Sequence, residues 1–204
     1  DPSSVELGDF LGIEDVAAER LSGHTSELFL NGLTTISDAA AASISRHKGS
    51  GLNLNGLTTL SDAAAASLGR YEGLLSLGGL TTLSDVAAAS LSRLAGELWL
   101  PGLTILSDSP GHLALAASLC YQEGWLDLSA LTTLSDAAAE ALSRRKGELD
   151  LSGLHALSDA GAASLSRHEG WLELNGLATL SDQAAEAFSR HQGWLRFNGL
   201  TSLS

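Results

Sequence analysis

The chain repeats one short sequence unit from end to end, and this repetition limits its fold more than any other feature. The clearest copy, Leu52–Gly73, reads LNLNGLTTLSDAAAASLGRYEG. The first apolar residue of each copy falls at Val5, Leu28, Leu52, Leu75, Leu98, Leu126, Leu149, Leu172 and Leu195. The steps between these positions are 23 residues, apart from one step of 24 and one of 28. Such a period is typical of stacked supersecondary units, so we expect residues 1–204 to form a single solenoid of about nine 23-residue repeats.

Each copy predicts a short strand followed by a short helix. Leu52 and Leu54 alternate with Asn53, which predicts a strand with one apolar face. Asp62 precedes an Ala-rich segment with helical apolar spacing, and we expect its carboxylate to cap that helix. We expect Gly73 to end the helix in a left-handed conformation. The aspartate recurs as Asp15, Asp38, Asp85, Asp108, Asp136, Asp159 and Asp182, and the glycine recurs as Gly49, Gly96, Gly124, Gly147, Gly170 and Gly193.

Two places depart from the regular period. The 28-residue step contains a five-residue insertion near 109–113, and Pro110 and Gly111 within it predict a surface loop. The last repeat is incomplete, because the sequence stops at Ser204 before the next aspartate and helix. We expect either a longer array or end-to-end self-association through this open repeat.

The repeated columns Leu-x-Leu, x-Gly-Leu, Leu-Ser-Asp and Ala-Ala-x-x-Leu-Ser resemble those of leucine-rich repeats. The similarity is to the cysteine-containing subclass, in which Leu57, Leu60 and Ser61-Asp62 would stand for Cys, Ile and Thr-Asp. Leu100-Pro101 is also similar to short bacterial surface repeats with a proline after the strand. The resemblance implies an α/β fold, a right-handed solenoid with a parallel concave sheet and short convex helices. It further implies binding through the sheet and no catalysis.

Composition narrows the kinds of partner. The chain has 11 Lys and Arg against 24 Asp and Glu, a net charge of −13, which argues against nucleic acid because phosphate binding needs clustered basic residues. No apolar run is long enough for membrane insertion. The lone Cys120 excludes an internal disulfide framework and leaves the compartment open. Among locations, a secreted or cell-surface one is favoured.

The outward strand positions are the informative ones, because the fold does not dictate them. One column reads Glu27, Gly51, Leu74, Glu97, Trp125, Glu148, Trp171 and Trp194. The next reads Phe29, Asn53, Ser76, Trp99, Asp127, Asp150, Glu173 and Arg196. Tryptophan is enriched at binding hot spots, and like charges on neighbouring strands are destabilising. The candidate ligand-binding residues are therefore Trp99, Trp125, Asp127, Asp150, Trp171, Glu173, Trp194 and Arg196.

Trp171 and Trp194 should lie side by side, with Trp99 adjacent to this group on the next column. We expect the unneutralised acids to favour a cationic or polyhydroxylated ligand. Three readings stay open: a protein or peptide partner, a glycan, or a purely structural spacer of a larger surface protein.

The sequence favours no enzyme. Carboxylates on adjacent strands match the spacing of a retaining glycosidase pair, but an open sheet offers them no enclosing cleft. His168 and His191 are neighbours in a histidine column, and two ligands do not complete a zinc shell. We therefore expect neither a metal site nor a cofactor.

Overall fold

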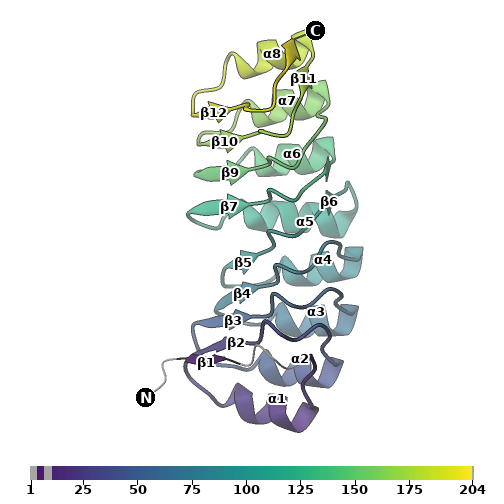
Figure 1. Cartoon of the computed structure of the whole chain (residues 1–204), viewed down its shortest axis with the longest axis vertical. Helices are drawn as coiled ribbons and strands as arrows, with labels where there is room; N and C mark the ends of the chain where they lie inside the picture. Colours follow the sequence, from purple (N-terminus) through teal and green to yellow (C-terminus); the bar gives the residue numbers. More distant parts are fainter. Residues whose placement is uncertain (1–3, 7–10, 204) are drawn as a thin grey trace. The chain divides into compact units, whose positions relative to one another are not determined.

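The computed structural model describes residues 4–6 and 11–203 and shows an α/β repeat solenoid, in which short parallel strands alternate with short helices (Figure 1). The expected fold class is thereby confirmed. The chain falls into two compact units, residues 1–101 and 102–204. Each unit has its own parallel sheet and its own row of helices.

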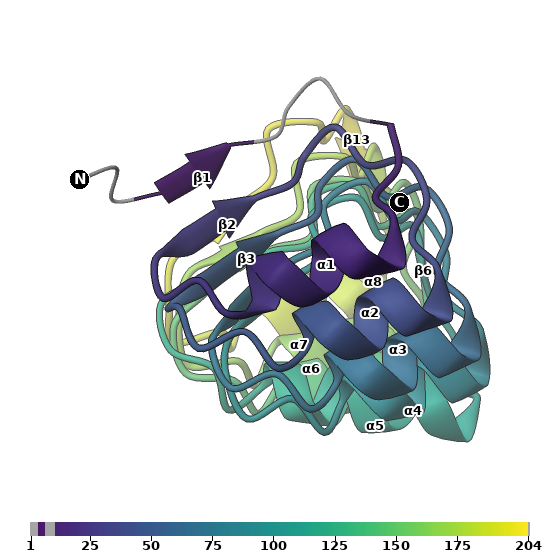
Figure 2. The ribbon, with the colours of Figure 1, turned by 90° about the horizontal axis from the view of Figure 1, so that it is seen from below.

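The first unit contains a five-stranded sheet in sequence order, with helices α1 to α4 side by side (Figures 1 and 2). Its strands are β1 (Ser4–Glu6), β2 (Glu27–Phe29), β3 (Gly51–Asn53), β4 (Leu74–Ser76) and β5 (Leu98–Trp99). Its helices are α1 (Asp15–Ser22), α2 (Asp38–Ile44), α3 (Asp62–Leu68) and α4 (Asp85–Leu91). The register pairs equivalent residues of successive repeats, as in Leu28 with Leu52 and Leu52 with Leu75.

The second unit repeats this plan. Its main sheet runs β7 (Trp125–Asp127), β9 (Glu148–Asp150), β10 (Leu172–Glu173) and β12 (Leu195–Arg196). Its helices are α5 (Pro110–Leu119), α6 (Asp136–Leu142), α7 (Asp159–Leu165) and α8 (Asp182–Phe188). Two short ladders, which the sequence did not predict, pair β6 (Ile105–Leu106) with β8 (Thr133–Leu134) and β11 (Thr179–Leu180) with β13 (Ser202–Leu203).

The core consists of leucine and alanine columns. In one repeat, Leu52, Leu54 and Leu57 are fully buried, and Ala64 and Ala65 of α3 pack behind them. The same columns are buried in both units, so the apolar pattern of the sequence was read correctly. Alanine on the inner helix face lets each helix lie close to its strand.

The helix caps differ from the prediction by one residue. Ser61 is the N-cap of α3, and its hydroxyl accepts from the Ala64 N–H at 3.0 Å, while Asp62 is already helical. The aspartate instead links repeats: the Ser37 hydroxyl donates to Asp15 Oδ1 at 2.5 Å. The same serine-to-aspartate bond joins Ser61 to Asp38, Ser84 to Asp62, Ser158 to Asp136 and Ser181 to Asp159. We call this series the serine–aspartate ladder.

The recurrent glycines do not end the helices, so that prediction was wrong. Helix α7 ends at Leu165 with Ser166 as a right-handed C-cap, ahead of Gly170. Within residues 4–6 and 11–203, positive φ occurs only at Gly124 and Gly147. A Cβ added at Gly170 would lie 2.0 Å from the Gly147 carbonyl oxygen, so the close approach of successive repeats excludes a side chain there.

The insertion near 109–113 is helical where we predicted a loop. Helix α5 starts at Pro110, with Ser109 as its N-cap, and is ten residues long. Proline is well tolerated at the first helical position, because that residue's N–H has no intrahelical partner in any case. The insertion therefore adds a first turn to α5.

Candidate binding surface on the second unit

The main sheet of the second unit presents a grid of outward side chains. The strand register pairs Trp125 with Glu148 and Asp127 with Asp150. It also pairs Asp150 with Glu173, and Glu173 with Arg196. We call this grid, with Trp171 and Trp194, the sheet face of the second unit. Seven of the eight predicted ligand-binding residues lie on it: Trp125, Asp127, Asp150, Trp171, Glu173, Trp194 and Arg196.

Trp171 and Trp194 lie side by side, as predicted. Their ring centroids are 5.3 Å apart with an interplanar angle of 33°, a separation typical of interacting aromatic pairs. They nevertheless remain 41% and 70% exposed. A hollow of about 170 Å³ opens between them, lined by the two indoles and by Leu172, Glu173, Leu195 and Arg196.

The other two tryptophans are also exposed. Trp125 lies opposite Glu148 and is 55% exposed. Trp99 belongs to the first unit, where it lies opposite Ser76 and is 49% exposed. The expectation that Trp99 lies next to the other tryptophans stays a prediction.

Two of the acids of this face, Asp127 and Asp150, each bond to the backbone nearby. Asp127 Oδ1 accepts from the Ser129 N–H at 2.9 Å, and Asp150 Oδ1 accepts from the Ser152 N–H at 2.8 Å. Aspartate commonly holds a turn in this way, by bonding the backbone two residues on. Each side chain therefore fixes the turn that follows its strand.

Glu173 is held by two neighbours. Its Oε1 accepts from Arg196 Nη1 at 2.8 Å, and its Oε2 accepts from Asn175 Nδ2 at 2.9 Å. This pair forms a polar margin for the hollow beside Trp171 and Trp194. Because Arg196 is half exposed, solvent screening keeps the pair's contribution to stability small.

Glu148 differs from the other three acids of this face. Its side chain is exposed, and within the described part of the chain its carboxylate makes no hydrogen bond or ion pair. The register places it between Trp125 on one neighbouring strand and Trp171 on the other. Sequence analysis placed Glu148 in the right column but did not single it out.

Beneath this face lies a buried arginine that sequence analysis missed. Arg145 is 1% exposed, and its guanidinium donates to the carbonyl oxygens of Leu119, Gln122, Gly124 and Glu148 at 2.9, 2.6, 2.6 and 3.3 Å. Burial lowers the pKa of Arg145, but arginine stays charged in proteins. Gly124 directly precedes Trp125, so Arg145 fixes the backbone at the starts of β7 and β9.

Histidines occupy the position equivalent to Arg145 in the following repeats. His168 Nε2 lies 2.9 Å from the Gly147 carbonyl oxygen, and His191 Nε2 lies 3.3 Å from that of Gly170. Their rings stack with centroids 6.3 Å apart. Burial lowers the pKa of His168, which favours the neutral ring. In residues 4–6 and 11–203, no group of three or more His, Cys, Asp or Glu side chains could hold a metal ion.

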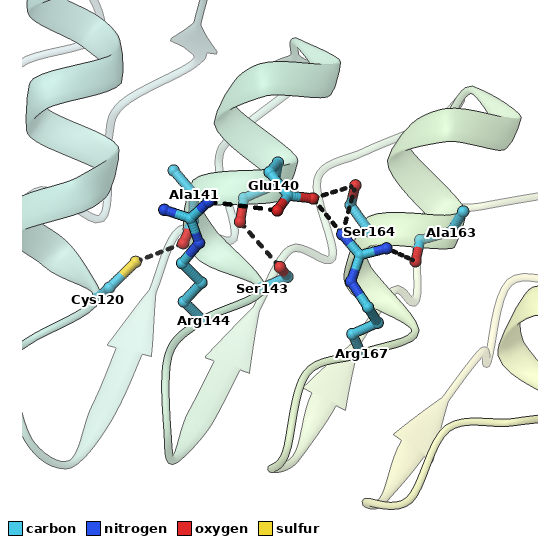
Figure 3. A network of polar contacts seen from close by, with 8 residues as sticks. All are labelled: Cys120, Glu140, Ala141, Ser143, Arg144, Ala163, Ser164 and Arg167. Carbon is cyan, nitrogen blue, oxygen red and sulfur yellow. Dashed lines mark hydrogen bonds and ion pairs between the residues drawn. The ribbon is translucent and has the colours of Figure 1, made fainter.

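The exposed arginines near the helix ends form a second polar region (Figure 3). Glu140 pairs with both Arg144, at 3.4 Å, and Arg167. The hydrogen bond from Ser164, followed by the two guanidinium groups, lowers the pKa of Glu140. Because Arg144 and Arg167 already have a carboxylate partner, this region is a weaker candidate than the sheet face.

Cys120 borders the same region and is poorly suited to chemistry. Its thiol donates to the Ala141 carbonyl oxygen at 2.7 Å (Figure 3). Burial raises its pKa to about 11, so the thiolate that nucleophilic chemistry requires is scarce near neutral pH.

A scan of protein-family models and a search of curated proteins both gave no match to this chain. Among the described helices, none has the length and apolar character required to cross a membrane. The geometry therefore defines an α/β repeat solenoid with an aromatic and acidic sheet face on its second unit.

Proposed function

We propose that this chain is a non-enzymatic repeat scaffold that binds a protein or peptide partner through the sheet face of the second unit. The pair Trp171 and Trp194 carries the proposal, because these two large indoles line a hollow and stay partly exposed. Leaving such apolar side chains in solvent gives up the free energy that their burial would supply, and exposed apolar patches often mark binding sites. Tryptophan in such positions is enriched among the residues that dominate binding energy. The resemblance to leucine-rich repeats, whose sheets bind partners, supports the same surface.

The acids of this face support binding better than catalysis. Asp127 and Asp150 each hold a backbone N–H, and Glu173 holds Arg196. A general acid or nucleophile needs a carboxyl group aimed at a substrate in a site that limits water. We therefore propose no reaction for this surface.

A glycan is the second candidate, because indole faces stack on sugar rings. Asn175 and Asn198 lie beyond the hollow on the same repeats, and amides and carboxylates bond sugar hydroxyls. A structural spacer is the remaining alternative. It assigns no role to the exposed indoles.

The test is a pull-down and a glycan array with the purified chain and a Trp171→Ala, Trp194→Ala double variant. Tyr121→Ala is the matched control, since Tyr121 is 88% exposed and lies outside the sheet. We expect a protein or peptide ligand that is lost in the double variant and retained in the control. If every ligand binds the double variant as well as the original chain, the proposal is wrong and the spacer becomes the better account.

A further inference from the structure

The exposed carboxylate of Glu148, flanked by two indoles, indicates what the partner carries. Resting on the function proposed above, we propose that a lysine or arginine side chain of the partner binds Glu148 between Trp125 and Trp171. We call this place the cation site.

The strand register builds the cation site. Trp125 is paired with Glu148, and Leu149 is paired with Leu172, which sets Trp171 opposite Glu148 on the other side. The Leu149 N–H donates to the Trp171 carbonyl oxygen at 2.8 Å, so these two strands are in direct contact there. Neighbouring strands lie about 4.8 Å apart, so the two indoles begin about 10 Å apart across Glu148. A cation beside Glu148 is attracted to an indole whose face it meets within about 6 Å, so either flanking tryptophan can contribute.

The charges of this face favour a cation over a neutral or anionic group. Asp127 and Asp150 are each bonded to a backbone N–H, and Glu173 is bonded to Arg196. The carboxylate of Glu148, by contrast, makes no hydrogen bond or ion pair with any residue that the structure describes. A partner's ammonium or guanidinium group would supply the opposite charge and would contact a flanking indole face.

The cation site is held in place from below before any partner arrives. Arg145 donates to the Glu148 carbonyl oxygen at 3.3 Å and to that of Gly124, next to Trp125, at 2.6 Å. The starts of β7 and β9, which carry Trp125 and Glu148, are thus tied to one buried group. A surface that is already ordered loses less entropy on binding.

The hollow beside the cation site extends the recognition pattern. Trp171 borders Glu148 on one side and shares the hollow of about 170 Å³ with Trp194 on the other. That space suits an apolar side chain. The partner segment therefore combines a basic residue with a neighbouring apolar residue.

The experiment uses a soluble library of fluorescent hexapeptides, each with one arginine beside one apolar residue. A matched library carries citrulline, which has nearly the shape of arginine but no charge. Binding to the full chain is measured by fluorescence anisotropy. The variants are Glu148→Gln and, as the matched control, Glu97→Gln, which changes the exposed glutamate of the same column in the first unit. Circular dichroism confirms that each variant is folded.

We expect the best arginine peptides to bind about tenfold more tightly than their citrulline counterparts, a ratio of the size given by one cation–aromatic contact with a charge partner. Glu148→Gln should reduce that ratio to about one, and Glu97→Gln should leave it unchanged. High salt should weaken the arginine peptides more than the citrulline peptides.

Other outcomes overturn the inference in distinguishable ways. If the peptides need Trp171 and Trp194 but bind Glu148→Gln with the same arginine preference, the sheet face binds partners and the cation site is wrong. If the chain binds neutral oligosaccharides and no peptide, the cation site is wrong and the glycan reading replaces it. If no ligand depends on either set of residues, both proposals fall.

Discussion

The two units share one backbone plan and differ in what their sheets present. In the first unit, the first outward column holds Glu27, Gly51, Leu74 and Glu97; in the second, it holds Trp125, Glu148, Trp171 and Trp194. The buried leucine and alanine columns are the same in both. The buried positions, which the packing of one repeat on the next requires to be apolar, are therefore the same in both units. The outward strand positions, which this packing does not constrain, are where the two units differ.

The units also differ just behind the sheet. In the first unit the Tyr71 hydroxyl donates one bond, 2.7 Å long, to the Gly49 carbonyl oxygen. At the equivalent position in the second unit, Arg145 donates to four carbonyl oxygens. The richer set of bonds lies at the starts of the strands with the exposed indoles, where we propose binding.

The largest expected effect tests the shared core. Leu54→Ala in the first unit and Leu151→Ala in the second remove equivalent, fully buried side chains. Each should lower the free energy of unfolding by about 2 to 5 kcal/mol, from lost burial and the remaining cavity. Urea unfolding of the full chain measures both. A cost near zero for either leucine would contradict the shared leucine core.

Next in size is the difference behind the sheet. Arg145→Leu leaves four carbonyl oxygens without their donor and should cost about 3 kcal/mol, whereas Tyr71→Phe removes one hydroxyl and should cost about 1 kcal/mol. Exposed Arg144→Leu serves as the control and should stay within about 0.5 kcal/mol. If Arg145→Leu and Tyr71→Phe lowered the free energy of unfolding equally, the two units would not differ in how strongly this position stabilises them.

Acid should destabilise both units through one buried histidine in each. Burial lowers the pKa of His47 and of His168 below the ordinary value of 6.5, and His191 and Arg145 act in the same direction on His168. Stability should therefore be level above about pH 7 and fall as the pH drops from about 6.5 through the lowered pKa values. His47→Gln and His168→Gln should each flatten part of this dependence in urea titrations at successive pH values. An unchanged slope in both variants would show that these rings are not the sensitive groups.

The smallest expected effect on stability belongs to the exposed indoles. Trp194→Ala should change the free energy of unfolding by about 0.5 kcal/mol, because Trp194 is 70% exposed, and adding Trp171→Ala should cost about 1 kcal/mol more, because Trp171 is 41% exposed. The double variant should lose the ligand of the second unit. A loss of several kcal/mol would instead mean that the indoles serve packing, and the functional contrast between the units would disappear.

The sequence was sufficient for the features that recur in every repeat. Leu-x-Leu placed the strands, helical apolar spacing placed the buried helix faces, and strand alternation placed Trp171 beside Trp194. Contacts between repeats were harder to infer. Serine and aspartate are both good N-caps, so the Ser-Asp pair alone did not show that Ser61 caps and Asp62 reaches the next repeat.

Arg145 was missed for a related reason. Adjacent Arg144 and Arg145 look like a solvated basic pair, and only their columns distinguish them, because Tyr71 and His168, which are equivalent to Arg145, are buried. The available signal was that Arg145 is a charged residue at a repeat position that holds an aromatic ring in other repeats. The identity of a ligand has no such periodic signal, because it depends on side chains that stacking leaves free.

The serine–aspartate ladder also bears on how such a chain can change its length. Within the second unit, Ser158 donates to the repeat before it, and Asp159 of the same repeat accepts from Ser181 of the repeat after it. Deleting one whole period, residues 148–170, would bring Ser181 to Asp136 and restore the bond. Deleting half a period would leave a donor and an acceptor out of phase. Insertions and deletions in this chain should therefore be tolerated when they add or remove whole repeats, so that the length of the chain changes in steps of one repeat.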